Sequence, residues 1–405
     1  MNLTLPITEL KRLTTLLRPF NLHRTNLQVL QHVRLQHLQA GGAVTAFADN
    51  LSMALIAALT PSRASGGLHA SVPAALLTRI AREADKDSSV QLTVADGAGE
   101  WTWFTQGVAM VQQEPVLPAA DFPPVDTSGF AHGLWMKPDM LTQLSHALSH
   151  VSTDECRYVL NGVFLDASHH TMVATDGRRL LCCPSSVPIP CDAILPTAAA
   201  QYLVSHAGGE IPLWFRTPSA PETTAQPGPT IAQQPPTSLA SHAMARLAGN
   251  ALFVFRCIDQ GHYPNYRQVI PRECYGTAQL RPGTQESLIT KLKRAGRNAK
   301  AVFSLKDGGC YLRFSYEKAD GRQPSDWQHI GTSTFQHPGI MPAFSLDFIV
   351  DALESLPDPI LHFTDEQGPV TLTSAGSTVV IMPLRLDAPG PPPRSPQGAA
   401  TSVAV

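Results

Sequence analysis

Helical segments that recur at regular spacing, with strand-like runs between them, set the strongest limit on how this chain folds. Along six segments, apolar residues return every three or four positions, which is typical of helices that bury one face. In each successive pair, the second helix begins roughly 60 residues after the first. Ser345 stands at the N-cap position of the last helix. The six segments are 7–18, 73–86, 138–150, 196–207, 285–297 and 345–356.

Strand-like runs fill the intervals between these helices. The runs are 43–59, 90–105, 157–165, 171–182, 251–258, 301–316 and 370–384. One helix, several strands, one helix and several strands, repeated three times, indicate an internal repeat of architecture. We therefore expect an α+β chain of three similar domains.

Proline-containing segments place the domain boundaries. Residues 118–124 read Pro-Ala-Ala-Asp-Phe-Pro-Pro and end the first unit, and Pro271 ends the second. The chain of 405 residues is long enough for several domains of ordinary size. We therefore expect domains at residues 1–125, 129–271 and 272–386.

Two further proline-rich stretches fit no domain. Residues 217–238 hold six prolines without apolar periodicity, and we expect a disordered or polyproline insertion within a hairpin of the second domain. Residues 387–405 hold five prolines, and we expect a flexible tail there. Because this tail follows the last strand directly, we hypothesise that it lies across a groove beside that strand and occludes it.

Composition excludes a uniformly basic nucleic-acid binder. The formal net charge is −2 and 15% of the residues are charged, so any nucleic-acid contact must come from a local basic surface. The seven cysteines contain no C-x-x-C pair, which favours free thiols in a reducing cytosol over disulfides. Neither a signal peptide nor a run of about 18 apolar residues is visible, so we expect a cytoplasmic protein without a membrane segment.

Two short segments, far apart in the chain, are the most distinctive. Residues 174–180 read Ala-Thr-Asp-Gly-Arg-Arg-Leu, and Asp-Gly is typical of a tight turn with one residue at positive φ. Residues 378–386 read Thr-Val-Val-Ile-Met-Pro-Leu-Arg-Leu. Taken alone, the first segment is more simply an ordinary hairpin with solvated arginines, and the second is an ordinary core strand.

Together with residues 157–162 and 261–271, these two segments resemble the signature segments of the bacterial DNA sliding clamp, the β subunit of the replicative polymerase. The resemblance spans residues 1–386 without the insertion. It implies three domains of the DNA-clamp type, each with two helices on antiparallel sheets, which form a crescent that is half of a ring. Such a ring encircles duplex DNA without reading its sequence and confers processivity on DNA polymerase. The resemblance implies neither catalysis nor a cofactor.

The resemblance also implies one pocket, between the second and third domains, for short peptides of polymerase and clamp-loader subunits. Burying two apolar anchors of such a peptide contributes roughly 3–6 kcal/mol before ordering costs. Met382 suits a surface with many clients because Met adapts its shape. Backbone groups near Gly177 and Met382 are expected to hydrogen-bond an extended peptide. By matching position, the pocket residues are Leu160, Thr175, Gly177, Arg178, Arg179, Leu180, Pro264, Val269, Val380, Ile381, Met382, Pro383, Leu384 and Arg385.

Basic residues at positions that match the family's DNA-facing helices and loops form the second implied site. Lysine and arginine there meet phosphates without reading bases. For each basic helix, a solvated outer face is the alternative. The third helix carries His146 and His150, which are mostly neutral near physiological pH, so we expect weak and salt-sensitive contact. The DNA-contact residues are Lys11, Arg12, Arg24, Arg79, Arg82, Arg157 and Tyr158.

Ring closure requires a homodimer whose two copies meet head to tail through the first and third domains. The aligned junction segments are residues 291–297, which are basic, and residues 111–115, which read Val-Gln-Gln-Glu-Pro. Both are poor in apolar residues. The homodimer therefore depends on electrostatic pairing with Glu114, which contributes little at a wet rim.

Two other interpretations remain open. A metal-dependent enzyme with ligands at Asp166, His169, His170 and Asp176 fits no common zinc spacing, and adjacent histidines on a strand point to opposite faces. The sequence contains no G-x-x-x-x-G-K-[ST], H-E-x-x-H or G-x-S-x-G motif. A divergent clamp paralogue that binds partner peptides without closing a ring on DNA is favoured by the basic junction, the thin basic lining and the proline-rich additions.

Overall fold

The computed structural model describes residues 2–20, 26–37, 43–65, 68–95, 97–218, 239–296, 299–316, 323–335, 339–365 and 367–384. Its chain divides into two compact units. The first unit is Met1–Ala174 with Pro184–Tyr263, and the second is Thr175–Cys183 with Pro264–Val405. Arg24, all but the first two residues of the expected insertion at 217–238, and the expected tail at 387–405 lie outside the described residues.

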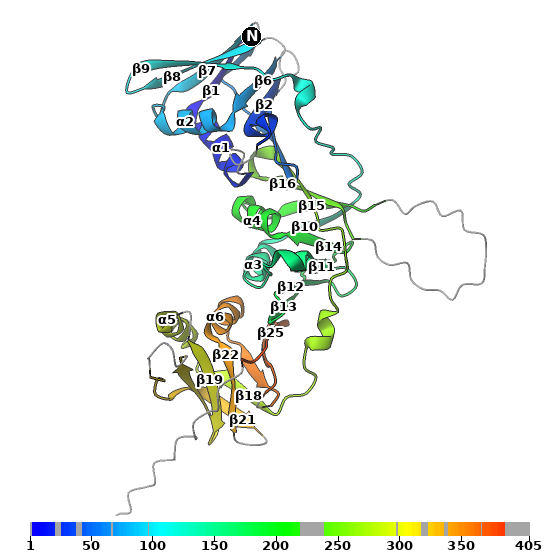
Figure 1. The fold of residues 1–405 in the computed structure, drawn as a ribbon, viewed down its shortest axis with the longest axis vertical. Helices are drawn as coiled ribbons and strands as arrows, with labels where there is room; N and C mark the ends of the chain where they lie inside the picture. Colours follow the sequence, from blue (N-terminus) through cyan, green and yellow to red (C-terminus); the bar gives the residue numbers. More distant parts are fainter. Residues whose placement is uncertain are drawn as a thin grey trace, which may run out of the picture. The chain divides into compact units, whose positions relative to one another are not determined.

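Helices pack in three pairs, as the sequence pattern predicts. In the first unit α1 packs on α2 and α3 packs on α4, and in the second unit α5 packs on α6, as Figure 1 shows. Each helix ends within about three residues of its predicted bounds. The helices are α1 (Ile7–Leu17), α2 (Ala74–Glu83), α3 (Pro138–Ala147), α4 (Thr197–His206), α5 (Gln285–Ala295) and α6 (Leu346–Ser355).

Each pair is held by the apolar stripe that the sequence spacing predicted. On α1 that stripe includes Leu10 and Leu13, and on α6 it includes Ile349 and Leu353, all of which are buried. Ser345 does precede α6, but its side chain makes no capping hydrogen bond. Burial of the stripe, rather than a cap, therefore stabilises this helix start.

Antiparallel sheets carry the helices of the first unit. One sheet has the order β5-β1-β7-β8-β9, a second has the order β10-β15-β16-β17-β4-β3-β2-β6, and β14-β11-β12 are neighbours. The strands are β1 (Asn2–Pro6), β2 (His32–His37), β3 (Val44–Asp49), β4 (Met53–Leu59), β5 (Arg63–Ser65), β6 (Leu68–Pro73), β7 (Ser89–Ala95), β8 (Ala98–Thr105), β9 (Val108–Pro115), β10 (His132–Met136), β11 (Gly162–Asp166), β12 (Thr171–Thr175), β14 (Ala193–Pro196), β15 (Ile211–Arg216), β16 (His242–Leu247) and β17 (Ala251–Arg256).

The second sheet of this unit is continuous across the expected boundary near residue 125. Strand β17 pairs with β4 in a register that places Phe253 opposite Leu55. The Tyr202 hydroxyl of α4 donates to the Leu16 carbonyl of α1 at 3.0 Å. Tyr202 also packs edge-on against Phe20 and contacts Phe253, with ring centroids 5.6 and 4.2 Å away. Helices and sheet thus share one aromatic core.

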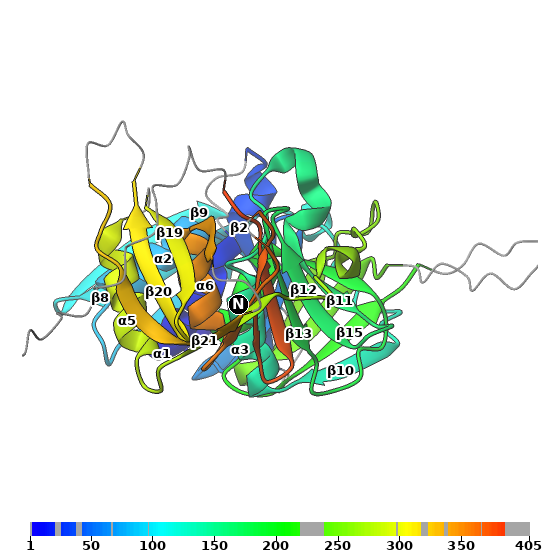
Figure 2. The same cartoon turned by 90° about the horizontal axis from the view of Figure 1, so that it is seen from below.

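The second unit is one antiparallel sheet with two helices. Its strand order is β13-β25-β24-β23-β18-β21-β20-β19-β22. Figure 2 shows β19, β20 and β21 beside α5 and α6. Phe303, Phe344 and Phe363 meet at its centre and are buried. The strands are β13 (Arg179–Pro184), β18 (Gly276–Leu280), β19 (Lys300–Lys306), β20 (Gly309–Ser315), β21 (Gln328–Phe335), β22 (Gly339–Ser345), β23 (Ile360–Phe363), β24 (Val370–Ser374) and β25 (Ser377–Ile381).

The α+β class with antiparallel sheets is therefore confirmed, but one predicted strand is partly wrong. The segment Glu155–Leu160 forms a 3-10 helix, and β11 begins only at Gly162. The side chain of Asp154 accepts a hydrogen bond from the Cys156 N–H at 3.0 Å, which starts that turn. Among the described residues, none of the helices has both the length and the apolar content needed to cross a membrane.

Candidate functional site

A tight turn between Thr175 and Arg179 is held by its own side chains. The Thr175 hydroxyl donates to the Arg179 carbonyl at 2.6 Å and accepts from the Gly177 N–H at 3.1 Å. One carboxylate oxygen of Asp176 accepts from the N–H groups of Arg178 and Arg179, at 2.8 and 3.0 Å. Gly177 has a φ of 85°, a region that favours glycine. The predicted turn with one residue at positive φ is therefore confirmed.

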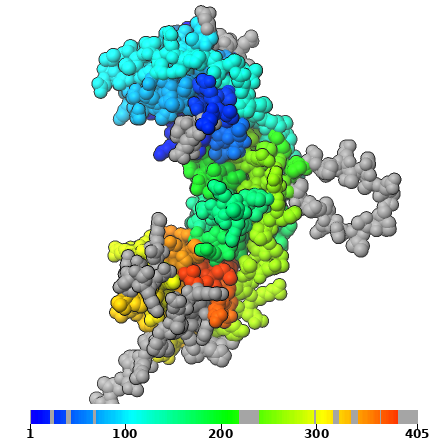
Figure 3. Space-filling model, in the orientation of Figure 1, coloured from blue at the N-terminus to red at the C-terminus, as the bar shows by residue number. Residues whose placement is uncertain are grey.

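Strand pairing brings this turn next to the last strand of the second unit. In the β13–β25 ladder, Arg179 lies opposite Ile381 and Leu180 opposite Val380. The Met382 N–H then donates to the Arg178 carbonyl at 2.9 Å. In Figure 3 the orange-red surface of β24 and β25 lies beside the orange surface of α6. The two distinctive sequence segments therefore meet.

Arg179 connects the turn to helix α6. Its guanidinium lies 3.1 Å from the Asp176 carboxylate and forms a second ion pair with Asp351. It also stands over the Phe348 ring, 4.3 Å from the centroid. Only 10% of the Arg179 side chain is exposed. Burial raises the pKa of Asp351, and the hydrogen bond from Arg179 opposes that rise.

The predicted pocket residues of this unit divide into a core set and a surface set. Leu180, Val380 and Ile381 are at most 3% exposed, so they belong to the core of the unit. Met382 is 44% exposed, so its apolar side chain lies at the surface of the unit. Gly177 and Arg178 are exposed as well, Thr175 is buried, and Arg179, Pro383 and Leu384 are half-buried.

Three N–H groups of the two segments are engaged within the unit, which limits the expected backbone hydrogen bonds to other groups. The N–H groups of Gly177 and Met382 donate to Thr175 and Arg178, and the Leu384 N–H donates to the Ala343 carbonyl at 2.7 Å. Pro383 has no N–H to offer. A peptide would therefore find apolar contacts and carbonyl groups here, rather than these backbone donors.

Of the four remaining predicted pocket residues, one lies in the first unit, two lie in the second unit, and one lies outside the described residues. Leu160 belongs to the first unit, where it is buried and its carbonyl accepts from the Ser152 N–H at 2.9 Å. Pro264 is exposed, and Val269, in the 3-10 helix Tyr266–Val269, is 51% exposed. Arg385 lies outside the described residues.

Two of the predicted DNA-contact residues on α1 differ in how they are held. Arg12 donates to both carboxylate oxygens of Glu9, at 3.0 and 2.7 Å, and to the Ala58 carbonyl at 2.5 Å. The side-chain hydrogen bonding between Arg12 and Glu9 lowers the pKa of Glu9 and raises the pKa of Arg12. Arg12 thus fastens α1 to β4. Lys11, its neighbour, is half-buried.

The other predicted DNA-contact residues differ in how far neighbouring side chains hold them. Arg79 donates to Gln112 and lies 5.5 Å from the Trp103 ring centroid, so it supports the β9 edge of the sheet. Arg82 has 75% of its side chain exposed and stands 3.4 Å from Glu83. The Arg157 side chain is 56% exposed and lies 3.6 Å from Asp154.

Tyr158 combines exposure with a packing role. It is 49% exposed, yet its hydroxyl lies where a side chain at Gly261 would begin, 2.9 Å from an ideal Cβ. Gly261 also has a φ of 83°, so both the close Tyr158 hydroxyl and the backbone conformation favour glycine there. The loop that presents Tyr158 is therefore braced by the segment that ends the first unit.

Strand β9 presents an apolar surface that the sequence did not reveal. It is the edge of its sheet and pairs only with β8 among the described strands. Along it Val108, Met110 and Val111 are exposed by 61, 42 and 58%. Residues 111–115 are poor in apolar groups, but the residues just before them are not. The sequence could not predict this exposure, because composition does not reveal which strand lies at the edge of a sheet.

The metal-site interpretation finds no support in the described part of the chain. There, no three His, Cys, Asp or Glu side chains are grouped as a metal ion requires. His169 bonds through Nδ1 to Asp166 at 2.8 Å, and Nδ1 of His170 accepts from the Ile189 N–H at 3.1 Å. Both histidines lie in a turn after β11, not on a strand as expected.

Comparison with known proteins gives one consistent result. No protein-family model matches the chain. A curated relative, the beta sliding clamp of Synechocystis sp., is 27% identical over 374 residues, which cover 85% of this chain and 88% of the relative. The crystal structure of the DNA polymerase III subunit beta from Pseudomonas aeruginosa aligns over 95% of this chain and 100% of its own, with a TM-score of 0.75 and 19% identity. The DNA polymerase sliding clamp from Caulobacter crescentus gives a TM-score of 0.76 at 20% identity, over 95% of this chain and 100% of its own.

Proposed function

We propose that this chain, a divergent member of the bacterial DNA sliding clamp family, encircles duplex DNA as a ring and tethers DNA polymerase to it. The observation that carries the proposal is the match to a sliding clamp over 88% of that relative's length. The three helix pairs on antiparallel sheets agree with that match. In this proposal residues 1–125, 129–271 and 272–386 are the three clamp domains.

The chain itself performs no catalysis in this proposal, and needs no cofactor. Processivity comes from topology, because a closed ring leaves DNA only by opening or by reaching an end. Polymerase activity then belongs to the partner. A replication role places the protein in the cytoplasm with the chromosome.

Partner proteins would bind at the turn of residues 175–179 and the adjacent end of β25. Several features support this assignment. The turn is fixed before any ligand arrives, the Met382 side chain is exposed, and a buried floor of Leu180 and Val380 lies beneath. A preorganised apolar surface lowers the ordering cost of binding a short peptide. Clamp-loader subunits would compete with polymerase for the same surface.

DNA contact in this proposal is weak and independent of sequence. Arg12 and Arg79 are engaged by Glu9 and Gln112, so Arg82, Arg157 and Lys11 carry more of the contact with phosphate. A closed ring does not depend on such contacts, because retention by encirclement requires no affinity. Few exposed cations are therefore compatible with a working clamp.

A homodimer would close the ring through strand β9 and helix α5. The exposed apolar side chains of Val108, Met110 and Val111 supply apolar contact that residues 111–115 alone do not offer, and β9 is an edge strand among the described strands. Sedimentation at micromolar concentration tests this step. A dimer of two 43.6 kDa chains is the expected species, and a single chain at all concentrations would refute the ring.

Loading on circular DNA tests the function as a whole. We expect a bacterial clamp loader with ATP to place the labelled protein on nicked circular duplex DNA, where it resists high salt. Cutting the circle should then release it. The paralogue alternative predicts binding of partner peptides without retention on the circle, and that result would overturn the proposal.

A further inference from the structure

Strand β10 has a free edge where its two structural counterparts are covered. Strands β1, β10 and β18 each precede the first helix of a helix pair, and each pairs on one side with the strand that follows the second helix, which is β7, β15 or β23. On the other side β1 pairs with β5 and β18 pairs with β21, antiparallel in both cases. Figure 1 shows β10 beside β15, and among the described strands β10 has no second neighbour. The other two copies of this arrangement therefore indicate what would cover the edge, namely an antiparallel strand.

The backbone of β10 is open to such pairing. Every second residue of an edge strand directs its N–H and C=O groups away from the sheet. Among the described residues, the backbone of His132–Met136 forms hydrogen bonds with no strand other than β15. The sequence of the strand, His-Gly-Leu-Trp-Met, also lacks the lysine, proline or inward-facing charge that usually protects an edge. This edge can therefore accept a further strand.

The exposed face of β10 carries features that select the side chains of such a strand. Trp135 is 57% exposed, and Gly133, two residues earlier, lies on the same face because side chains alternate along a strand. Trp214 of β15 lies opposite Gly133, and its Cδ1 is 2.8 Å from the place where a Cβ of Gly133 would stand. Two indole rings thus flank a position without a side chain.

A cation stands at the end of this face. Lys137 follows β10 in extended backbone, with a φ of −75° and a ψ of 164°, and it is exposed. No ion pair of the described residues includes Lys137. The ladder with β15 ends at Met136 opposite Ile211, so Glu210, the residue before Ile211, lies on the β15 side of the strand. An acidic side chain on the free side would therefore pair with Lys137 without a competing carboxylate from β15.

We propose that β10 binds an extended segment of a partner protein as an added antiparallel strand. At every second position the segment places an acidic residue opposite Lys137, an apolar residue opposite Trp135 and a large apolar residue opposite Gly133, in that order along its chain. Main-chain hydrogen bonds supply the affinity, and the alternate side chains supply the specificity. The edge belongs to the first unit, whereas the turn at residues 175–179 belongs to the second, so this is a different binding surface.

Fluorescence anisotropy of labelled peptides with the full chain tests the strand pairing. The probe is Ser-Glu-Thr-Val-Thr-Phe-Ser, and a peptide of the same composition in scrambled order is the comparison. Two further peptides carry N-methyl groups on alternate backbone amides, one at Glu, Val and Phe and the other at both Thr residues. Only one of these sets can face β10, so we expect one methylated peptide to bind as the probe does and the other at least about tenfold more weakly. Equal affinities of the two methylated peptides, equal binding of the scrambled peptide, or no saturable binding would each overturn the proposal.

Variants of the chain locate the bound peptide. Trp135→Ala should weaken binding about tenfold, and Leu27→Ala, at an exposed leucine of the same unit, should leave it unchanged. Met382→Gln should also bind the probe as the parent does, because Met382 belongs to the other surface. Undiminished binding by Trp135→Ala, or weakened binding by Met382→Gln, would place the peptide elsewhere. Circular dichroism of each variant controls for folding.

A charge exchange tests the direction of the added strand. Lys137→Glu should weaken binding of the probe, and a probe with Lys in place of Glu should recover the loss. A failure of this exchange would contradict the assigned register. Sedimentation of Trp135→Ala tests the competing occupant. If that substitution abolishes a dimer that the parent chain forms, the edge belongs to a second copy of this chain and the proposal fails.

Discussion

Arg179 and Asp351 lie 172 residues apart and form an ion pair that fastens the turn at residues 175–179 to helix α6. The same guanidinium also bonds Asp176 inside the turn and stands over Phe348 on α6. Arg179 is therefore a positioning residue: it fixes the shape of the proposed peptide surface with little of its own side chain exposed.

Replacing Arg179 with Ala should loosen the turn and lower the free energy of unfolding by about 1–3 kcal/mol, because two carboxylates lose a charged partner. Affinity for a clamp-binding peptide should fall about tenfold, since the peptide must then order the turn. Urea unfolding and peptide fluorescence anisotropy measure the two effects. Arg272→Ala, at an exposed arginine of the same unit that is not a predicted pocket residue, is the matched control. Equal effects of the two variants would contradict the positioning role.

Met382→Gln should weaken peptide binding about tenfold, because an apolar contact is replaced by a polar side chain that a ligand must desolvate. Met382 is 44% exposed, so stability should change little. Ile360→Gln is the control, since Ile360 is 40% exposed in the same unit but outside the proposed surface. Calorimetric titration with one peptide serves both variants. A Met382→Gln protein that binds as the parent does would remove this side chain from the site.

The Glu9–Arg12 pair should give an acid-dependent stability. The hydrogen bond from Arg12 lowers the pKa of Glu9 below the ordinary value of a glutamate. The folded state therefore binds fewer protons than the unfolded state. The contribution of the pair is present above the unfolded pKa and is lost as pH falls through the folded pKa. Glu9→Gln should accordingly destabilise the protein most at neutral pH, and the difference from the parent should shrink as the pH falls through the acid range. Urea unfolding across a pH series measures this, and a difference that does not shrink in acid would show that the pair does not titrate in this way.

Arg82→Ala should reduce the salt dependence of duplex binding without affecting stability. Arg82 is an exposed cation, and removing one cation that meets a phosphate lowers the slope of log K against log salt by about 1. Arg12→Ala should instead reduce stability, because Arg12 joins α1 to Glu9 and Ala58. Duplex titrations at several salt concentrations compare the two. An unchanged slope in Arg82→Ala would exclude phosphate binding by that side chain.

The periodic part of the fold could be predicted from sequence because helix stripes and their spacing are local properties. The stripe from Ile7 to Leu17 illustrates this, since every expected apolar position on it is buried. The prediction of a strand at residues 157–160 was wrong for an equally local reason. These residues suit a strand, but the Asp154 side chain and the surrounding turn override that preference.

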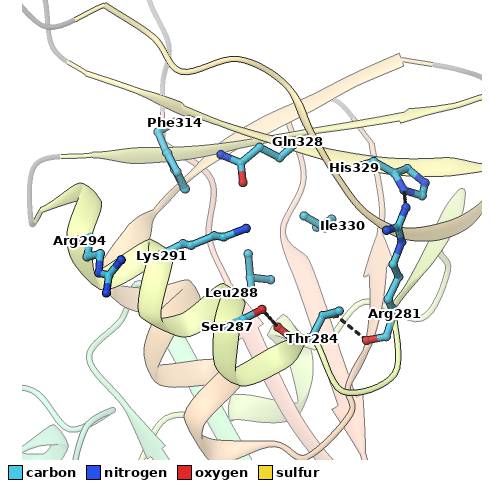
Figure 4. Close-up of a pocket in the computed structure, with 10 residues that line it drawn as sticks. All are labelled: Arg281, Thr284, Ser287, Leu288, Lys291, Arg294, Phe314, Gln328, His329 and Ile330. Carbon is cyan, nitrogen blue, oxygen red and sulfur yellow. Dashed lines mark hydrogen bonds between the residues drawn. The ribbon is translucent and has the colours of Figure 1, made fainter.

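The candidate site was only partly predictable. The Asp-Gly signal identifies the turn, but that the turn pairs with Ile381 and Met382 followed from the family resemblance, not from any spacing. Nothing local in the sequence revealed that backbone donors in both segments are occupied. A cavity between α5, β20 and β21, which Figure 4 shows, was also missed because only tertiary pairing sets these elements opposite one another.

The ladder between β4 and β17 has a practical consequence for anyone who dissects this protein. The boundary near residue 125 separates two stretches of sequence, yet the strand pairing of residues Met53 to Ala57 crosses it. A cut there would expose the edge of β4 on one fragment and the edge of β17 on the other, and each is a ready template for self-association. The stretches on the two sides of residue 125 are therefore better expressed as one piece than cut apart.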